Sequence, residues 1–161
     1  MEQFPYYPTD FSWRRKELSK FIQFQGNLWQ GKHIKQTMHG LALCWSYMPH
    51  SWEVRCNNLK SPFETFQTDR ERVDKKVIQM NHLNTPSGLR KTLRLMSGSQ
   101  GVSNFRPTAA TAIYNRFLPY GGITWDMSGG YGGRLLGAIK SQISYIATEP
   151  AEKTVIGLRE I

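Results

Sequence analysis

The feature that most constrains the fold is a turn with four glycines in five residues: Gly129, Gly130, Gly132 and Gly133. The apolar segment 123–127 before the turn predicts a short buried strand, and 134–140 after it predicts a helix. Residues 144–148 predict a second strand, which ends at Glu149. Strand, glycine turn, helix, strand and acid form half of a nucleotide-binding unit, in which glycines let the backbone approach a ligand closely.

The turn does not match the dinucleotide fingerprint G-x-G-x-x-G. A match that starts at Gly130 finds Leu135 at the third glycine position, and one that starts at Gly132 finds Arg134 at the second. A carboxylate, Asp126, instead stands at the strand end before the glycines, and Glu149 follows 23 residues later. A carboxylate at the end of the second strand can accept hydrogen bonds from both ribose hydroxyls of a nucleotide. A glycine turn with a purely structural role is the alternative.

The first two thirds of the chain predict helices. Asp10 or Ser12 can cap a helix that ends at about Gln25. Thr68 and Glu71 have the spacing of a capping box for a helix near 69–82. The predicted buried side of that helix comprises Val73, Val77, Ile78 and Met80. Further helices are expected over 89–96, from Pro107 to about Phe117, and from about Glu152.

These elements predict an α+β fold. A helix-rich basic domain is expected over residues 1–102, followed over 103–161 by an incomplete Rossmann-like strand–glycine turn–helix–strand unit. A sheet of only two strands leaves open edges, and Val155, Ile156 and Leu158 of the last helix would have no sheet to cover. We therefore expect a homodimer, a second protein chain as partner, or a reordered C-terminal segment.

Composition excludes several classes of protein. A hydrophobic content of 39% is enough for a core, and no apolar run approaches the roughly 18 residues that a membrane span needs. The first residues lack the pattern of a secretory signal, and two cysteines are too few for a disulfide scaffold. The sequence thus predicts a cytoplasmic protein. His39, Cys44, His50 and Cys56 do not have the spacing of a compact zinc site, so no metal is predicted.

The charge distribution indicates a polyanionic partner. The net charge is +9, and residues 1–120 hold 17 basic against 8 acidic residues. No carboxylate occurs between Asp74 and Asp126. A field of one sign attracts nucleic acid, although a basic face that only keeps the protein soluble is the alternative. The predicted nucleic-acid-binding residues are Lys75, Lys76, Arg90, Lys91, Arg94 and Arg106.

Aromatic residues near the N-terminus leave two interpretations open. Phe4, Tyr6, Tyr7, Phe11 and Trp13 precede a basic run at 14–16. They could stack on bases, with the basic side chains on phosphates. More often, such a cluster is an aromatic arm that packs on its own domain.

Residues 103–150 resemble the DNA amino-methyltransferase-like proteins common in phages and mobile elements. The resemblance is carried by SNFRPTAA at 103–110, by Ile113 and Tyr114, and by DMSGGYGGRLLGA at 126–138. Two upstream segments, 43–50 and 61–63, also look like the N-terminal region of that family.

The resemblance implies an S-adenosylmethionine site at the glycine turn. Asp126 would attract the ammonium group of the cofactor, and Glu149 would bind its ribose. The helix before the glycine strand would pack over the methionine end. The implied cofactor-binding residues are Phe105, Pro107, Thr108, Asp126, Ser128, Gly130, Gly132 and Glu149.

The chain departs from the family at the chemical step. Amino-methyltransferases carry a (D/N/S)-P-P-(Y/F/W) loop that holds the target amine and base, and this sequence contains no Pro-Pro pair. No catalytic residue is therefore predicted, and the resemblance is to an N-terminal portion truncated before the catalytic loop. The predicted function is half of a split DNA methyltransferase that needs a partner chain. The alternative is a non-catalytic phage or mobile-element module that binds DNA or a protein.

Overall fold

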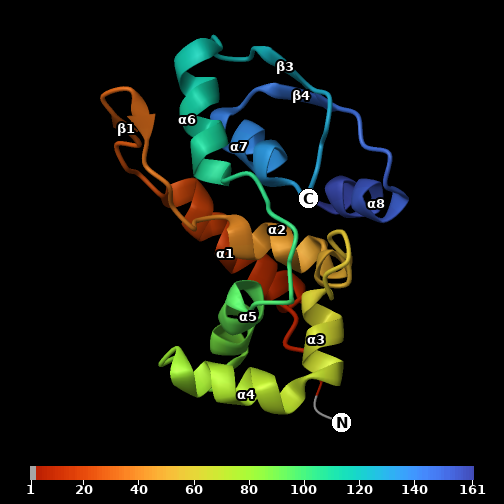
Figure 1. Ribbon diagram of the computed structural model, residues 1–161. Helices are drawn as coiled ribbons and strands as arrows, with labels where there is room; N and C mark the ends of the chain where they lie inside the picture. The colour runs from red at the N-terminus through yellow and green to blue at the C-terminus, as the bar shows by residue number, and fades with distance from the viewer. Residues whose placement is uncertain (1–2) are drawn as a thin grey trace. The chain divides into compact units, whose positions relative to one another are not determined.

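The computed structural model describes residues 3–161 and has an α+β fold (Figure 1). Helices dominate, and the strands are short and form two small sheets. The chain divides into two compact units. Of the described residues, unit 1 comprises 3–7 and 49–103, and unit 2 comprises 8–48 and 104–161. The boundary near residue 103 was expected, but residues 8–48 pack with the C-terminal part rather than with 49–102.

Unit 1 is helical. Its elements are a 3-10 helix at Pro49–Trp52, α3 (Pro62–Thr68), α4 (Arg70–Gln79) and α5 (Pro86–Leu95). The Ser61 hydroxyl accepts from the backbone N–H of Glu64, whose carboxylate accepts from the N–H of Ser61, so a capping box starts α3. The capping box predicted at Thr68 and Glu71 is wrong, because Thr68 ends α3 and Asp69 occupies the cap position of α4.

The core of unit 1 combines α4, α5 and the N-terminal aromatics. Phe4 is buried, and its ring centroid lies 5.6 Å from that of Trp52. Arg90 lies over the ring of Tyr7 at 3.9 Å and donates to the carbonyl of Pro5 at 2.9 Å. Of the two interpretations of the N-terminal aromatics, the packed arm is therefore the one realised for Phe4 and Tyr7.

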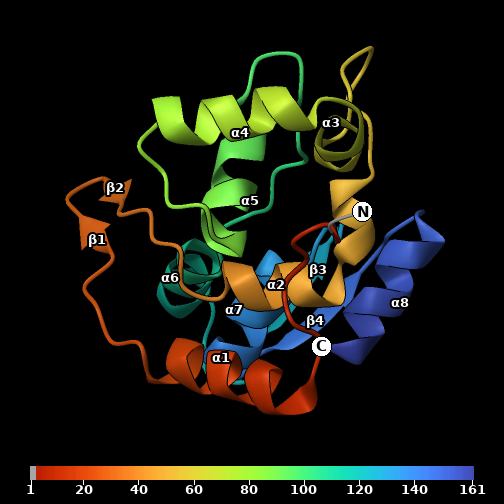
Figure 2. The same cartoon turned by 90° about the horizontal axis from the view of Figure 1, so that it is seen from below.

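Unit 2 contains both sheets. Its helices are α1 (Phe11–Gln23), α2 (Leu41–Tyr47), α6 (Pro107–Phe117), α7 (Gly133–Ser141) and α8 (Glu152–Glu160). Strands β1 (Trp29–Gln30) and β2 (His33–Ile34) form an antiparallel pair. Strands β3 (Ile123–Asp126) and β4 (Ser144–Ala147) pair in parallel, with Asp126 opposite Ala147. Figure 2 shows α1 beside α2, which it packs against.

Helices α6 and α7 pack closely on each other and on one face of the β3–β4 sheet. A Cβ atom at Gly137 would lie 2.5 Å from the Cβ of Ala110, so only glycine allows the two helices to approach this far. Pro107 stands at the first turn of α6, where its missing N–H removes no helical hydrogen bond. The predicted bounds of α6 agree with the observed ones, and those of α7 differ by one residue at each end.

Several burial predictions are wrong. Ile78 is exposed, although Val73 and Val77 of α4 are buried as expected. The strand predicted as buried, β3, leaves Ile123 and Trp125 about two-thirds exposed, because only one of its faces is covered. Arg90 and Arg94 of α5, predicted to bind nucleic acid, are half-buried against aromatic rings.

Within residues 3–161, the structure contains no helix that is both long enough and apolar enough to cross a membrane.

Candidate cofactor site and a second pocket

The glycine turn links β3 to α7 and closes on residues from both strands. Gly130 and Gly132 adopt positive φ angles of 56° and 83°, a region that side chains disfavour. The N–H of Gly129 donates to the carbonyl of Thr148 at 2.9 Å, and Asn104 Nδ2 donates to the carbonyl of Tyr131 at 2.9 Å. The turn is thus fixed to the end of β4 and to the segment before α6.

Asp126 is the centre of a polar network behind the turn. Its Oδ2 accepts from Arg134 Nε at 2.5 Å and from the Tyr145 hydroxyl, and its Oδ1 accepts from the N–H of Ser128 at 3.1 Å. Burial opposes ionisation, but these hydrogen bonds hold the pKa of Asp126 below its ordinary value. Burial and the hydrogen bond to this carboxylate raise the pKa of Tyr145. Asp126 is therefore a carboxylate whose charge is balanced within the chain.

Glu149 connects the second strand to the turn. Its Oε2 accepts from the N–H of Gly130 at 2.8 Å, and its Oε1 accepts from the N–H of Ala151 at 3.0 Å. The two acids that the sequence placed 23 residues apart thus meet at one glycine turn. Both carboxylates accept hydrogen bonds from groups of the chain. Those groups would have to rearrange if a ligand donated to the carboxylates instead.

The residues around the start of α6 separate into two places. Phe105 lies near the turn, with the guanidinium carbon of Arg134 5.4 Å from its ring centroid. Pro107 is buried, and a Cβ on Gly40 would lie 3.0 Å from its ring. The buried Thr108 shares a hydrogen bond of 2.8 Å with Thr37. The structure thus brings Phe105, but not Thr108, to the predicted cofactor site.

Helix α8 packs behind the turn. A Cβ on Gly129 would meet Leu158 Cδ1 at 3.1 Å, and one on Gly132 would meet Ile161 Cδ1 at 2.6 Å. Leu158 is therefore half-buried although the sheet does not extend beneath it, whereas Ile156 is exposed. The glycines of the turn make room for this helix as well as for the turn itself.

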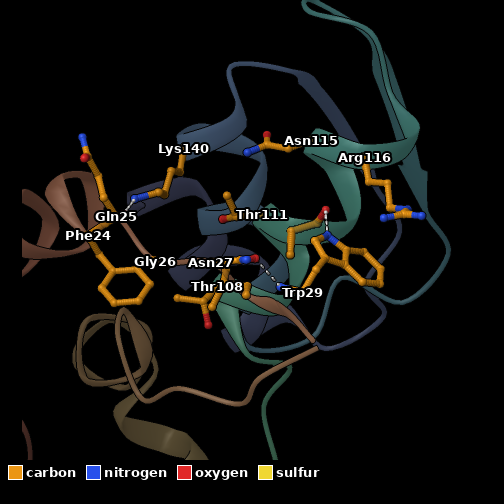
Figure 3. A pocket seen from close by; sticks show the side chains of 12 residues that line it. Phe24, Gln25, Gly26, Asn27, Trp29, Thr108, Thr111, Asn115, Arg116 and Lys140 are labelled. Carbon is orange, nitrogen blue, oxygen red and sulfur yellow. Dashed lines mark hydrogen bonds between the residues drawn. The ribbon is translucent and has the colours of Figure 1, made fainter. Parts of the chain in front are cut away.

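A second pocket lies at the other end of α7 and encloses about 380 Å³ (Figure 3). Thr108, Thr111, Asn115 and Arg116 from one side of α6 line it, as does Lys140 near the end of α7. Residues 24–29 close the opposite wall. Sequence reasoning missed this site because 24–29 carries no motif. The spacing of the polar residues of α6 by three, four and seven positions was the available signal.

The predicted nucleic-acid-binding residues are divided between the two units. Arg106 belongs to unit 2, whereas the other five belong to unit 1. On α4, Lys75 pairs with Glu71 at 2.6 Å and Lys76 donates to Gln79 at 2.9 Å. Lys91 on α5 is exposed. The half-buried arginines of α5 serve packing within unit 1.

Cys44 is buried, and burial raises the pKa of its thiol to about 12, so the thiol is protonated and a poor nucleophile. Among residues 3–161, no group of three or more His, Cys, Asp or Glu side chains is arranged to hold a metal ion.

Comparisons of the chain with protein-family models, with curated proteins and with solved structures found no match.

Proposed function

We propose that unit 2 is the S-adenosylmethionine-binding part of a DNA methyltransferase-like enzyme that acts together with a second protein chain. One observation carries the proposal. A glycine turn with positive φ angles joins two parallel strands through a helix, and the acids at the ends of both strands meet at that turn. This is the arrangement in which open α/β sheets bind nucleotides, at the carboxyl ends of their strands.

The residues of the turn fit the cofactor by chemistry. Glu149 would exchange its hydrogen bond with the N–H of Gly130 for the ribose hydroxyls, and the freed N–H of Gly130 would face the ligand. Asp126 would attract the ammonium group by exchanging its hydrogen bond with Arg134 for one with the cofactor. When bound, S-adenosylmethionine supplies an activated methyl group.

Calorimetric titration of the full chain with S-adenosylmethionine tests the proposal. Glu149→Gln keeps an acceptor for the Gly130 N–H but removes the carboxylate, so affinity should fall about tenfold. The matched control is Glu152→Gln on α8, an exposed residue that should leave affinity unchanged. Absence of binding by the unmodified chain, or equal effects of the two variants, would overturn the cofactor assignment.

The open face of the β3–β4 sheet is the observation that supports a second protein chain as partner. Ile123 and Trp125 of β3 are exposed, and so are Met127, which directly follows the strand, and Ile146 of β4. Parallel sheets are normally covered on both faces, and exposed apolar patches mark interaction surfaces. Sedimentation velocity of the purified chain distinguishes a homodimer from a monomer awaiting another protein. In the dimer case, Trp125→Ser should shift the chain to the monomer.

A DNA partner is supported by charge. Unit 2 holds twelve Lys and Arg residues against six Asp and Glu residues. Such a surplus attracts the phosphate backbone and makes binding depend on salt. A duplex-binding measurement over a range of salt concentrations would reveal this dependence, and affinity that does not change with salt would argue against phosphate contact.

The alternative function is a non-catalytic module that binds DNA or a protein. The engagement of Asp126 by Arg134 and Tyr145 favours it, because that carboxylate already has partners in the chain. Duplex binding without S-adenosylmethionine binding would support this alternative.

A further inference from the structure

The pocket at the end of α7 is firmly built. The Trp29 indole N–H donates to the carbonyl of Ala112 on α6 at 3.4 Å, and the backbone N–H of Trp29 donates to Asn27 Oδ1 at 3.1 Å. The ammonium group of Lys140 donates to the carbonyls of Phe21 and Ile22, both at 2.8 Å, and of Phe24 at 2.5 Å. Both ends of the wall formed by residues 24–29 are therefore anchored before any ligand arrives.

The polar groups that remain available have a definite chemistry. Lys140 uses its three N–H groups on carbonyls, so it is a structural cation and not a ligand for an anion. Arg116 is exposed and, within the part of the chain that the structure describes, forms no ion pair. The side-chain amide of Asn115 and the NH₂ group of Asn27 likewise have no hydrogen-bond partner among residues 3–161. With Gln25, three side-chain amides and one guanidinium thus line the pocket.

Aromatic surface completes the pocket. The guanidinium carbon of Arg116 lies 4.6 Å from the centroid of the half-buried Trp29 indole (Figure 3). No carboxylate lines the pocket, which therefore disfavours cations. Amides can donate to and accept from the edge of a base, a guanidinium matches a phosphate, and an indole stacks on a base of any kind.

We propose that this pocket binds one nucleotide. Its base would lie against Trp29 with Asn27 and Asn115 at its edge, and its phosphate would pair with Arg116. The volume of about 380 Å³ is at the lower end of small-molecule sites, which span roughly 300–1,000 Å³, and fits one nucleotide rather than two. The proposal goes beyond the proposed function, since the pocket and the glycine turn lie at opposite ends of α7.

The nucleotide could be free or part of a single strand, and the test separates these sources. The full chain is titrated with thymidine monophosphate, with thymidine, and with a short fluorescent single-stranded oligothymidylate. Binding of the monophosphate but not of thymidine is expected for a free nucleotide. Binding of the oligonucleotide alone assigns the pocket to a nucleotide within a strand. Binding of none of the three probes overturns the proposal.

Matched variants locate the site. Arg116→Ala should weaken binding about tenfold, and Asn115→Ala about threefold. The control is Arg15→Ala, which removes the same charge from an exposed position outside the pocket. It should change binding by less than about twofold. Both arginines are exposed, so neither variant should disturb the fold, and circular dichroism checks this. Equal losses for the two arginine variants would overturn the proposal.

The same variants keep the two proposals apart. Arg116→Ala should leave S-adenosylmethionine affinity unchanged, and Glu149→Gln should leave oligothymidylate affinity unchanged. If S-adenosylmethionine does not bind, the nucleotide titration still gives its own answer. If Arg116→Ala weakens S-adenosylmethionine binding tenfold, the pocket belongs to the cofactor and the separate nucleotide site is overturned.

Discussion

The two faces of the β3–β4 sheet differ in burial and in hydrogen bonding. On the covered face, Tyr145 packs with Tyr114 and Ala138 of the helices, and its hydroxyl donates to Asp126. On the open face, Ile123 and Trp125 are about two-thirds exposed. Apolar side chains stabilise the fold only where they are removed from water. One face therefore holds the unit together, and the other is available for a partner.

The largest expected loss of stability comes from a substitution on the covered face. Tyr114→Ala should lower the free energy of unfolding by about 3 kcal/mol, because the ring is buried between α6, α7 and β4 and its loss leaves a cavity. Urea denaturation measures the change. Tyr120→Ala, at a position 85% exposed, should alter stability by less than about 0.5 kcal/mol. Similar losses in both variants would contradict the assigned packing.

The next largest loss of stability is expected from a substitution in the contact between α6 and α7, which cover that face. Gly137→Ala places a Cβ 2.5 Å from the Cβ of Ala110 and should cost about 2 kcal/mol through overpacking. Gly121→Ala meets no atom within 4 Å but is strained by its φ of 72°, and should cost about 1 kcal/mol. Thermal unfolding of the two variants compares close packing with backbone strain. A smaller loss for Gly137→Ala than for Gly121→Ala would contradict the tight helix contact.

The polar edge of the covered face should show a pH signature. The pKa of Asp126 is lowered by folding, so its contribution to stability is present above the ordinary pKa of about 3.9 and is lost as pH falls through the lower folded value. Asp126→Asn should be less stable than the unmodified chain by about 1 kcal/mol at neutral pH, and the difference should disappear in acid. Urea midpoints across this range measure it. A difference independent of pH would show that charge is not responsible.

The smallest effect on stability belongs to the open face. Trp125→Ser should change the free energy of unfolding of the monomer by less than about 0.5 kcal/mol, because the indole is 67% exposed. Denaturation at low protein concentration isolates the monomer. A loss comparable to that of Tyr114→Ala would mean that the open face is covered from within the chain.

The parts of the fold that the sequence predicted well have strong local signals. Pro107 begins α6, Asp10 caps α1 through the N–H of Trp13, and the glycine turn joins a strand to α7 as expected. Local hydrogen bonding and backbone conformation determine such features. The burial of β3 was mispredicted because apolar composition does not reveal which face of a strand finds a neighbour.

The site was predictable in part. Asp126 and Glu149 meet at the turn because parallel strands bring their carboxyl ends to one edge. The engagement of Asp126 by Tyr145 and Arg134 depends on side-chain geometry that spacing does not reveal. Likewise, the pocket at Trp29 depends on a contact with Ala112, 83 residues away. Contacts of this range follow from tertiary packing, not from any local pattern.

The tie between Lys140 and the end of α1 has a consequence for the order of folding. Lys140 contacts Phe21 and Phe24, from which it is separated by 119 and 116 positions in the sequence. All of unit 1 after Tyr7 lies between these residues in the chain. During synthesis, residues 8–48 therefore cannot complete their packing until α7 has emerged from the ribosome. Until then Phe21 and Leu43, which are buried in the folded unit, are exposed. Helices α3 to α5, whose contacts are local, can pack together before α7 is synthesised. We therefore expect unit 2 to complete its folding after unit 1.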